Sequence, residues 1–187
     1  ARLLAAHAER EAWEQSQDDM LFAFVKSLVS TLDAKDPYTR GHSERVARVA
    51  RVLSQELGLS ATDIETVTLS ALLHDVGKVG IDDAVLRKPG ALNDQEMRHV
   101  QLHPEIGYRI LSHLPNFSHI LDGVRYHHER MDGQGYPSRL PGDEIPLVAR
   151  ILAVADAFDA MSSDRPFRAG MSRDRVEEIL RSGAGSQ

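Results

Sequence analysis

The chain has 187 residues, 42% of them hydrophobic, which suits one domain with a packed core and an additional helix. It contains no cysteine, so disulfides and thiolate metal sites are excluded, and metal ligands must come from His, Asp, Glu or water. The net charge of −6 argues against binding to a nucleic acid polymer or an anionic membrane surface. No apolar run approaches about 18 residues and no signal peptide is recognisable, so we expect a cytoplasmic protein without a membrane span in this segment.

The N-terminal segment, residues 1–28, reads as a lead-in helix. Ala6, Trp13, Met20 and Ser27 recur every seven residues and form a weak helical seam. The seam indicates either a short coiled coil that carries a signal into the domain or a lead-in helix with a solvated face, and both interpretations stay open. The chain begins without Met and ends in a polar stretch, so we expect both ends to be cuts in a longer protein.

Residues 29–187 are expected to form one domain with a truncated C-terminus. Apolar residues at helical spacing predict helices at 21–32, 43–57, 62–75, 93–102, 104–113, 117–128, 146–161 and 173–180. Residues 80–93 and 129–145 are expected to be loops, and the longer one is typical of a functional loop. No alternating strand pattern appears. The sequence therefore predicts an all-α fold, a helical bundle of about six or seven core helices behind the lead-in helix.

Polar residues recur on faces of these helices that should be buried. His42 shares a stripe with Val46, while His74 and Asp75 directly follow an apolar run. Asp156 interrupts a strongly apolar helix. A buried carboxylate is costly unless it is paired or bound to a metal. Because these residues come from several helices, they favour a metal site between facing helices.

Further candidate ligands lie near helix ends, at His103, His127 and His128. A single buried histidine is more often a hydrogen-bonded core residue, and the buried aspartate in the apolar helix has a salt bridge to Arg150 or Arg165 as its alternative. About six His and Asp ligands are too many for one tetrahedral site, but they suit two ions bridged by a carboxylate. Such a pair can bind a phosphate group, so the chemistry indicated is phosphoester hydrolysis.

Six ordered motifs over residues 36–168 resemble the HD-GYP subfamily of the HD-domain metal-dependent phosphohydrolases, and the resemblance covers about residues 30–180. The motifs are His42, Leu73-His-Asp-Val-Gly-Lys78, His103-Pro104, His127-His128-Glu129, Asp132-Gly-Gln-Gly-Tyr-Pro137 and Asp156-Ala-Phe-Asp-Ala160. The resemblance implies a bacterial cyclic di-GMP phosphodiesterase, a metal-dependent enzyme that hydrolyses the cyclic dinucleotide to linear pGpG and often on to GMP. It also implies the output domain of a signalling protein.

The resemblance also implies a set of metal ligands, namely His42, His74, Asp75, His103, His127, His128 and Asp156. Asp75 would bridge two divalent ions. His74 and Asp156 would bind one ion, and His103, His127 and His128 would bind the other. Fe or Mn is the favoured metal, with Ni, Mg or Zn as alternatives. Relatives that hold a third metal carry a Glu where this chain has Tyr38, so we expect a dinuclear site.

The expected catalytic residues are Asp75 and Lys78. Lys78, Arg165 and Arg168 match positions that contact the substrate phosphates, and the planar arginine fork suits that role. Tyr136, in the Gly-Tyr-Pro loop, is expected to shape the pocket and contact substrate.

Two carboxylates beside the loop, Glu129 and Asp132, are expected to support the ligand histidines through hydrogen bonds.

The resemblance further implies partners: cyclic di-GMP, an upstream sensory or receiver domain, and a second copy in a homodimer. A diguanylate cyclase or another regulatory protein would bind through the Gly-Tyr-Pro loop. Two alternatives stay open: an HD hydrolase acting on another nucleotide, and a catalytically weak domain that senses a cyclic dinucleotide or acts as a scaffold. The complete ligand set favours the enzyme.

Overall fold

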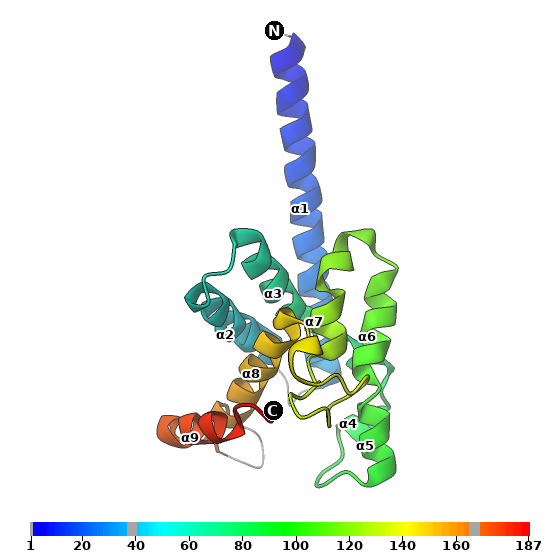
Figure 1. Ribbon diagram of the computed structural model, residues 1–187. Coiled ribbons are helices and arrows are strands. Elements are labelled where there is room, and N and C mark those ends of the chain that lie inside the picture. Colours follow the sequence, from blue (N-terminus) through cyan, green and yellow to red (C-terminus); the bar gives the residue numbers. More distant parts are fainter. Residues whose placement is uncertain (1, 37–40, 165–168) are drawn as a thin grey trace.

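The computed structural model describes residues 2–36, 41–164 and 169–187, and these contain helices and loops but no strand (Figure 1). The all-α bundle expected from the sequence is confirmed. The helices are α1 (Arg2–Lys35), α2 (His42–Glu56), α3 (Ala61–Leu73), α4 (Asp83–Leu86), α5 (Asp94–Val100), α6 (His103–Ser112), α7 (Leu121–Tyr126), α8 (Leu147–Ser162) and α9 (Arg173–Gly183). Short 3-10 helices occur at η2 (Val76–Gly80), η3 (Pro115–Ile120) and η4 (Gly142–Glu144).

Helix α1 is one continuous helix, where the sequence predicted a lead-in segment and a separate core helix. It contains neither Gly nor Pro, so nothing in it breaks the backbone hydrogen-bond ladder. Its first half projects away from the body, and its last turns pack into the bundle (Figure 1). Trp13 and Met20 of the seven-residue seam are 64% and 63% exposed, so this face meets solvent in a single chain.

The core consists of two clusters that meet at α3. Val25, Val29 and Leu32 of α1 pack with Leu73 and with residues from the α6–α7 region. On the other side, Val67 and Ala71 of α3 pack with α2 and α8. Leu73 is fully buried, and its replacement by Ala would cost about 2–5 kcal/mol of stability. The C-terminal end of α3 is therefore held between two packed layers, and the His-Asp pair follows at that point.

Helix α3 ends at Leu73, two residues before the predicted end, and the chain turns into η2. The turn brings the backbone close to α6: a Cβ on Gly77 would lie 1.9 Å from the carbonyl oxygen of His103. Only glycine fits so close an approach, so Gly77 is what lets the segment after the His-Asp pair lie against the start of α6.

Two other segments differ from the predicted boundaries. The expected loop 80–93 contains the short helix α4, which begins where the Asp82 side chain accepts a hydrogen bond from the Ala84 amide at 2.8 Å. The expected helix 117–128 divides into η3 and α7. Phe117 and Ile120, three residues apart, are both buried, and 3-10 geometry places such a pair on one face.

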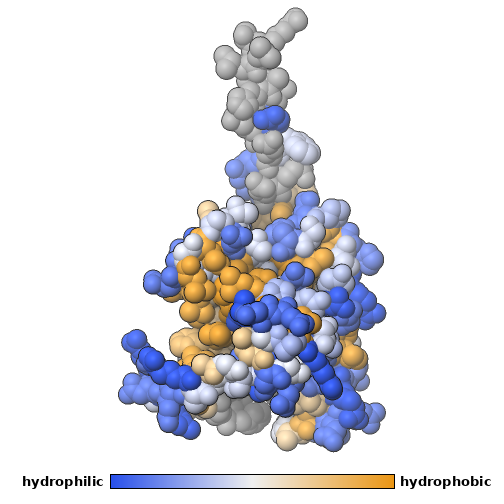
Figure 2. All heavy atoms as spheres, viewed as in Figure 1, coloured by the Kyte–Doolittle hydropathy of each residue, from blue (hydrophilic) through white to orange (hydrophobic). Residues whose placement is uncertain are grey.

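Two surfaces of the molecule differ in character. Figure 2 shows hydrophobic side chains concentrated on the part of the body where α2, α3 and α8 lie, and a strongly hydrophilic surface over α9. In α9 only Val176 is buried, and its Arg and Glu residues face solvent. Within the described parts of the chain, no helix combines the length and apolar composition needed to cross a bilayer.

Candidate metal centre

Three histidines from different elements are oriented by the same local hydrogen bond. In His74, His103 and His127, Nδ1 lies 2.7, 2.8 and 2.9 Å from the carbonyl oxygen three residues earlier. A carbonyl oxygen only accepts hydrogen bonds, so each Nδ1 carries a proton and Nε2 is the ring nitrogen left for another partner. All three side chains are buried. Each therefore directs its Nε2 to the interior.

The Nε2 atoms of these three histidines converge on one region of the interior. The Nε2 atoms of His103 and His127 are 3.2 Å apart, with two lone pairs facing each other. His74 Nε2 is buried and has no hydrogen-bond partner. Burial lowers the pKa of His103 and of His127, so added protons would not relieve the contact. Divalent cations would satisfy these nitrogens, and the ligand types present fit such ions.

Asp75 lies between the histidine groups, at the start of η2. Its Oδ1 is 3.3 Å from His103 Nε2, while its Oδ2 is 3.5 Å from His74 Nε2 and 3.9 Å from His42 Nε2. Burial alone would raise the pKa of Asp75, but neighbouring charges, Lys78 foremost, hold it well below its usual value. The carboxylate is therefore ionised, and its two oxygens face different histidines, as a bridging ligand requires.

His42, the first residue of α2, contacts two carboxylates of α8. Its Nε2 lies 3.2 Å from Asp156 Oδ1, and its Nδ1 lies 2.7 Å from Asp159 Oδ2. Burial tends to lower the pKa of His42, but the bonds to Asp156 and Asp159 outweigh it and raise the pKa to about 9. Without metal, the imidazole is thus a cation that donates to both carboxylates. Binding a metal through Nε2 requires that it release one proton.

The alternative explanation for Asp156, a salt bridge to Arg150, is wrong. Arg150 instead pairs with Asp143, at 2.9 Å between Nη1 and Oδ1. Arg165, the other arginine considered as a partner, lies outside the described residues.

Asp159 is a site residue that the sequence analysis did not assign a role. It is buried on the same face of α8 as Asp156, and accepts hydrogen bonds from Arg45 Nε at 2.6 Å and Ser163 Oγ at 3.0 Å. A carboxylate that holds the far nitrogen of a ligand histidine fixes the ring and increases its basicity. The signal was present in Asp156-Ala-Phe-Asp159, two carboxylates one turn apart in an apolar helix.

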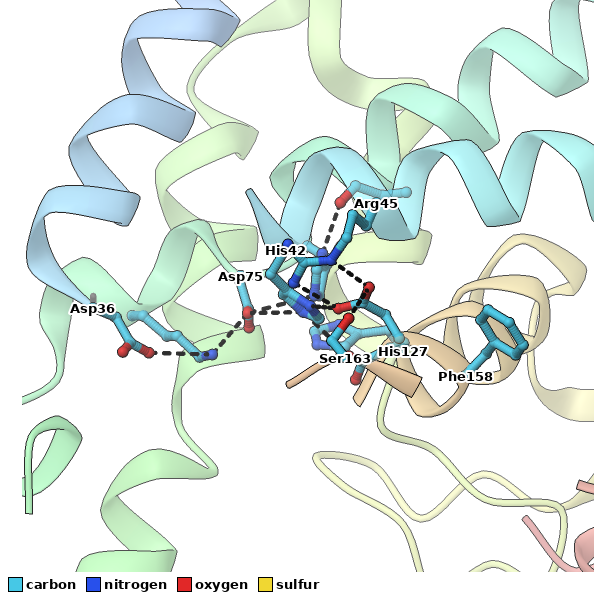
Figure 3. Close-up of polar contacts among 12 residues, drawn as sticks. Asp36, His42, Arg45, Asp75, His127, Phe158 and Ser163 are labelled. Carbon is cyan, nitrogen blue, oxygen red and sulfur yellow. Dashed lines mark hydrogen bonds and ion pairs between the residues drawn. The ribbon is translucent and has the colours of Figure 1, made fainter. Parts of the chain in front are cut away.

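The structure brings all seven expected ligands to one place, where α2, α3, α6, α7 and α8 meet. Two groups have ligand atoms within 4.8 Å of one another: His42, His74 and Asp75 form one, and His103, His127 and His128 the other. Figure 3 shows His42, Asp75 and His127 pointing toward one another from separate elements, with Asp36 at one end of the network. This is the arrangement that a dinuclear site would need.

Two expected substrate contacts flank the ligands. Lys78 Nζ lies 2.7 Å from Asp75 Oδ2, so the ammonium group is at the metal ligands. Tyr136 stacks on the His128 ring, with centroids 4.7 Å apart, and burial raises the pKa of its hydroxyl. A cavity of about 630 Å³ opens here, lined among others by His128, Tyr136, Arg150 and Asp156. Arg168 and Tyr38 lie outside the described residues, as does Arg165.

The carboxylates expected to support the ligand histidines bond within the loop instead. Glu129 is 3% exposed and accepts three backbone hydrogen bonds, at 2.6, 3.1 and 3.0 Å, from the amides of residues 138–140. Asp132 pairs with Arg130 at 2.6 Å. The expectation was therefore wrong. A buried carboxylate here satisfies loop amides that no helix ladder could satisfy.

Comparison with known proteins agrees with this geometry. The model of the HD domain family matches residues 26–187. The chain is 43% identical over 163 residues to 3'3'-cGAMP-specific phosphodiesterase 3 of Vibrio cholerae, covering 87% of this chain and 35% of that protein. It is 42% identical over 182 residues to the cyclic di-GMP phosphodiesterase response regulator RpfG of Xanthomonas campestris, covering 96% and 46%. The chain thus spans less than half the length of these two relatives.

Solved structures show the same fold. A crystal structure of the cyclic GMP-AMP specific phosphodiesterase V-cGAP3 of V. cholerae matches with a TM-score of 0.54 and 39% identity, over 88% of this chain and 37% of that one. The HD domain of the Listeria monocytogenes phosphodiesterase PgpH, solved with cyclic-di-AMP, matches in fold at 19% identity and a TM-score of 0.58, over 83% and 80%. With the family model covering most of its length and the expected motifs converging in space, the chain belongs to the HD domain family, in its HD-GYP branch.

Proposed function

We propose that this domain is a metal-dependent phosphodiesterase that hydrolyses cyclic di-GMP to linear pGpG and on to GMP. The observation that carries the proposal is the pair of facing, unprotonated imidazole nitrogens of His103 and His127, with the ionised Asp75 shared between them and a second ligand group. Such an arrangement is unfavourable unless it binds cations, and two cations this close suit a phosphate group. The names of the relatives support cyclic dinucleotides as the substrate class.

The proposed ligand sets follow from the two groups. Asp75 is the proposed bridging ligand. The first set is completed by His42, His74 and Asp156, and the second by His103, His127 and His128. Bound there, two divalent ions would lower the pKa of a water molecule and bind phosphate oxygens. Fe or Mn is the proposed metal, with Ni, Mg or Zn as alternatives, because carboxylates and imidazoles without thiolates suit hard to borderline ions of this kind.

The chain's own residues bind and orient the substrate. The ammonium group of Lys78, beside the bridging carboxylate, donates to the scissile phosphate and stabilises the negative charge that develops there. Arg165 and Arg168 are proposed to hold the other phosphate in bidentate contacts. Tyr136, on the wall of the cavity, offers an aromatic face to a base.

The proposed setting is a cytoplasmic signalling protein in which a sensory or receiver domain precedes this one. We propose a homodimer formed through α1, because Trp13 and Met20 are exposed at heptad spacing on a helix that leaves the body. The Gly-Tyr-Pro loop is the proposed surface for a diguanylate cyclase or other regulatory protein.

Product analysis tests this proposal. The protein, loaded with Mn(II) or Fe(II), is incubated with cyclic di-GMP and with 3'3'-cGAMP, the second candidate favoured by the V. cholerae relative. Linear dinucleotide, detected by chromatography and mass spectrometry, is expected with metal and absent after chelation. If no metal yields linear product from either compound, the domain is a sensor or scaffold, or a hydrolase of another nucleotide.

A further inference from the structure

The C-terminal end of α1 is attached to the segment that carries Lys78. Arg87 donates hydrogen bonds to the last carbonyl groups of α1, through Nη2 to Lys35 at 2.9 Å and to Ala34 at 3.4 Å. These carbonyls have no partner within the helix, so the arginine fixes the helix end. In return, Lys35 Nζ donates to the Val79 carbonyl at 2.8 Å, in η2. The helix end is thus joined to η2 through Lys35 and to the end of α4 through Arg87.

Asp36, the next residue, extends this junction to the metal site. Its amide donates to the Leu32 carbonyl at 2.8 Å, so the backbone of α1 sets the position of the residue. It is 7% exposed, and its Oδ2 lies 3.9 Å from Lys78 Nζ on the side away from the metal ligands (Figure 3). Lys78 therefore lies between two carboxylates, Asp75 of the candidate metal site and Asp36 of the helix end.

The two carboxylates have different roles once cations are bound. In the proposed function, the charge of Asp75 is shared with two divalent ions, which repel an ammonium group. Asp36 then supplies the negative charge that keeps Lys78 at the site. A half-buried ammonium group that loses this counter-ion would move, and the movement would weaken its contact with a phosphate.

We propose that Asp36 is a positioning residue that holds Lys78 for the reaction and makes the position of Lys78 depend on the end of α1. The inference rests on the proposed function for the role of Lys78 in turnover. A displacement of α1 would move Asp36 with it, so this ion pair carries a signal that arrives along the helix to the phosphate-binding group.

Kinetics of the variant Asp36→Asn in the Mn(II)-loaded full chain test the proposal. We expect kcat for cyclic di-GMP to fall about tenfold, with KM and bound metal nearly unchanged, because a displaced catalytic contact lowers the rate more than the occupancy. Asp36→Glu should restore part of the loss. In a Lys78→Ala background, Asp36→Asn should have no further effect. Equal losses in both backgrounds, or an unchanged kcat in the single variant, would overturn the proposal.

A readout without turnover separates this proposal from the proposed function. Lysine acylation followed by mass spectrometry measures how readily Lys78 reacts, and Asp36→Asn should change its rate several-fold whether or not the protein is an active enzyme. Lys88, paired with Glu96 at 2.6 Å away from the site, is the internal reference. Glu96→Gln should alter labelling at Lys88 alone and leave kcat unchanged. An unchanged labelling rate at Lys78 would refute the role of Asp36 by itself.

Discussion

The two halves of the candidate metal site use the same residue type in opposite charge states. Where α2 meets α8, His42 lies between Asp156 and Asp159 and its pKa is raised to about 9. Where α6 meets α7, His128 is half-buried beside other histidines, and desolvation lowers its pKa to about 3. An imidazole takes its charge from its neighbours: carboxylates retain the proton, and burial among imidazoles removes it. The first half must release a proton to bind a metal, while the second is ready to bind.

The largest effect is expected from the residue that both halves share. Asp75→Ala should abolish hydrolysis and remove bound metal together, with activity at least about a hundredfold below the parent, because loss of a ligand should exceed the loss of an outer partner. Metal analysis and a turnover assay on the same sample check this. Full turnover and full metal content in the variant would show that Asp75 bridges nothing.

Removing a histidine from one half should separate the two ions. His127→Ala is expected to leave about one ion per chain, held by the other half, and to abolish turnover, since the reaction needs both. His42→Ala should lose the other ion and leave the α6–α7 half loaded. Metal content measured after gel filtration distinguishes the halves. Loss of all metal in both variants would mean that the halves do not bind independently.

Asp159→Asn should weaken only the charged half. The amide keeps a hydrogen bond to His42 but not the negative charge, so metal affinity and turnover should fall about 10- to 100-fold. Isothermal titration calorimetry with Mn(II) gives the metal affinity of each half. Ser163→Ala, which removes a single hydrogen bond to Asp159, is the matched control and should have a small effect. An unchanged metal affinity in Asp159→Asn would show that the charge of Asp159 does not support His42 as a ligand.

The pH dependence should differ between the halves. Below pH 9 the His42 imidazole carries a proton that a metal must displace, so the affinity of its half should rise about tenfold per pH unit up to about pH 9 and then level off. The affinity of the α6–α7 half should stay nearly constant between neutral pH and pH 9, because His128, with a pKa of about 3, is already deprotonated there. Calorimetry in buffers of different ionisation enthalpy counts the protons released. Release of no proton at neutral pH would contradict the charge state assigned to His42.

The smallest effect on chemistry is expected outside both halves. Glu129→Gln removes the charge of the side chain that accepts hydrogen bonds from three loop amides. The free energy of unfolding should fall by about 1–3 kcal/mol, while the metal content stays at the parent level. Denaturant unfolding and metal analysis check the two readouts. Loss of metal from this variant would restore the expectation that Glu129 supports a ligand histidine.

Much of the fold and the ligand set could be predicted because each signal was local. Helix α8 was found at 146–161 from its apolar run, within one residue of Leu147–Ser162, and α2 was found from Val46 and its stripe. The candidate ligands were recognised because a carboxylate or imidazole on a buried face requires a partner. The predicted helix boundaries were wrong where packing against a distant segment decided them. At Gly77, for example, the chain that follows α3 lies against α6.

Partners that join distant segments could not be predicted. Asp36 and Lys78 are 42 positions apart, and Glu129 turned out to serve the loop rather than the histidines. Asp159 was visible in the sequence, but its bond to His42 spans 117 positions. The residue type alone does not distinguish a carboxylate that holds a ligand histidine from one that accepts hydrogen bonds from loop amides, because the buried group is a carboxylate in both cases.

The sequence by itself determined the all-α class, the residue types available to a metal and the order of the HD-GYP motifs, since these depend on composition and on periodicity along one helix. Only the tertiary structure decided which nitrogen of each histidine faces the site and which half is charged. It also decided that the end of α1 reaches Lys78 through Asp36. The physical reason is that charge state and hydrogen-bond direction depend on neighbours within about 4 Å in space, which the chain brings together only when it folds.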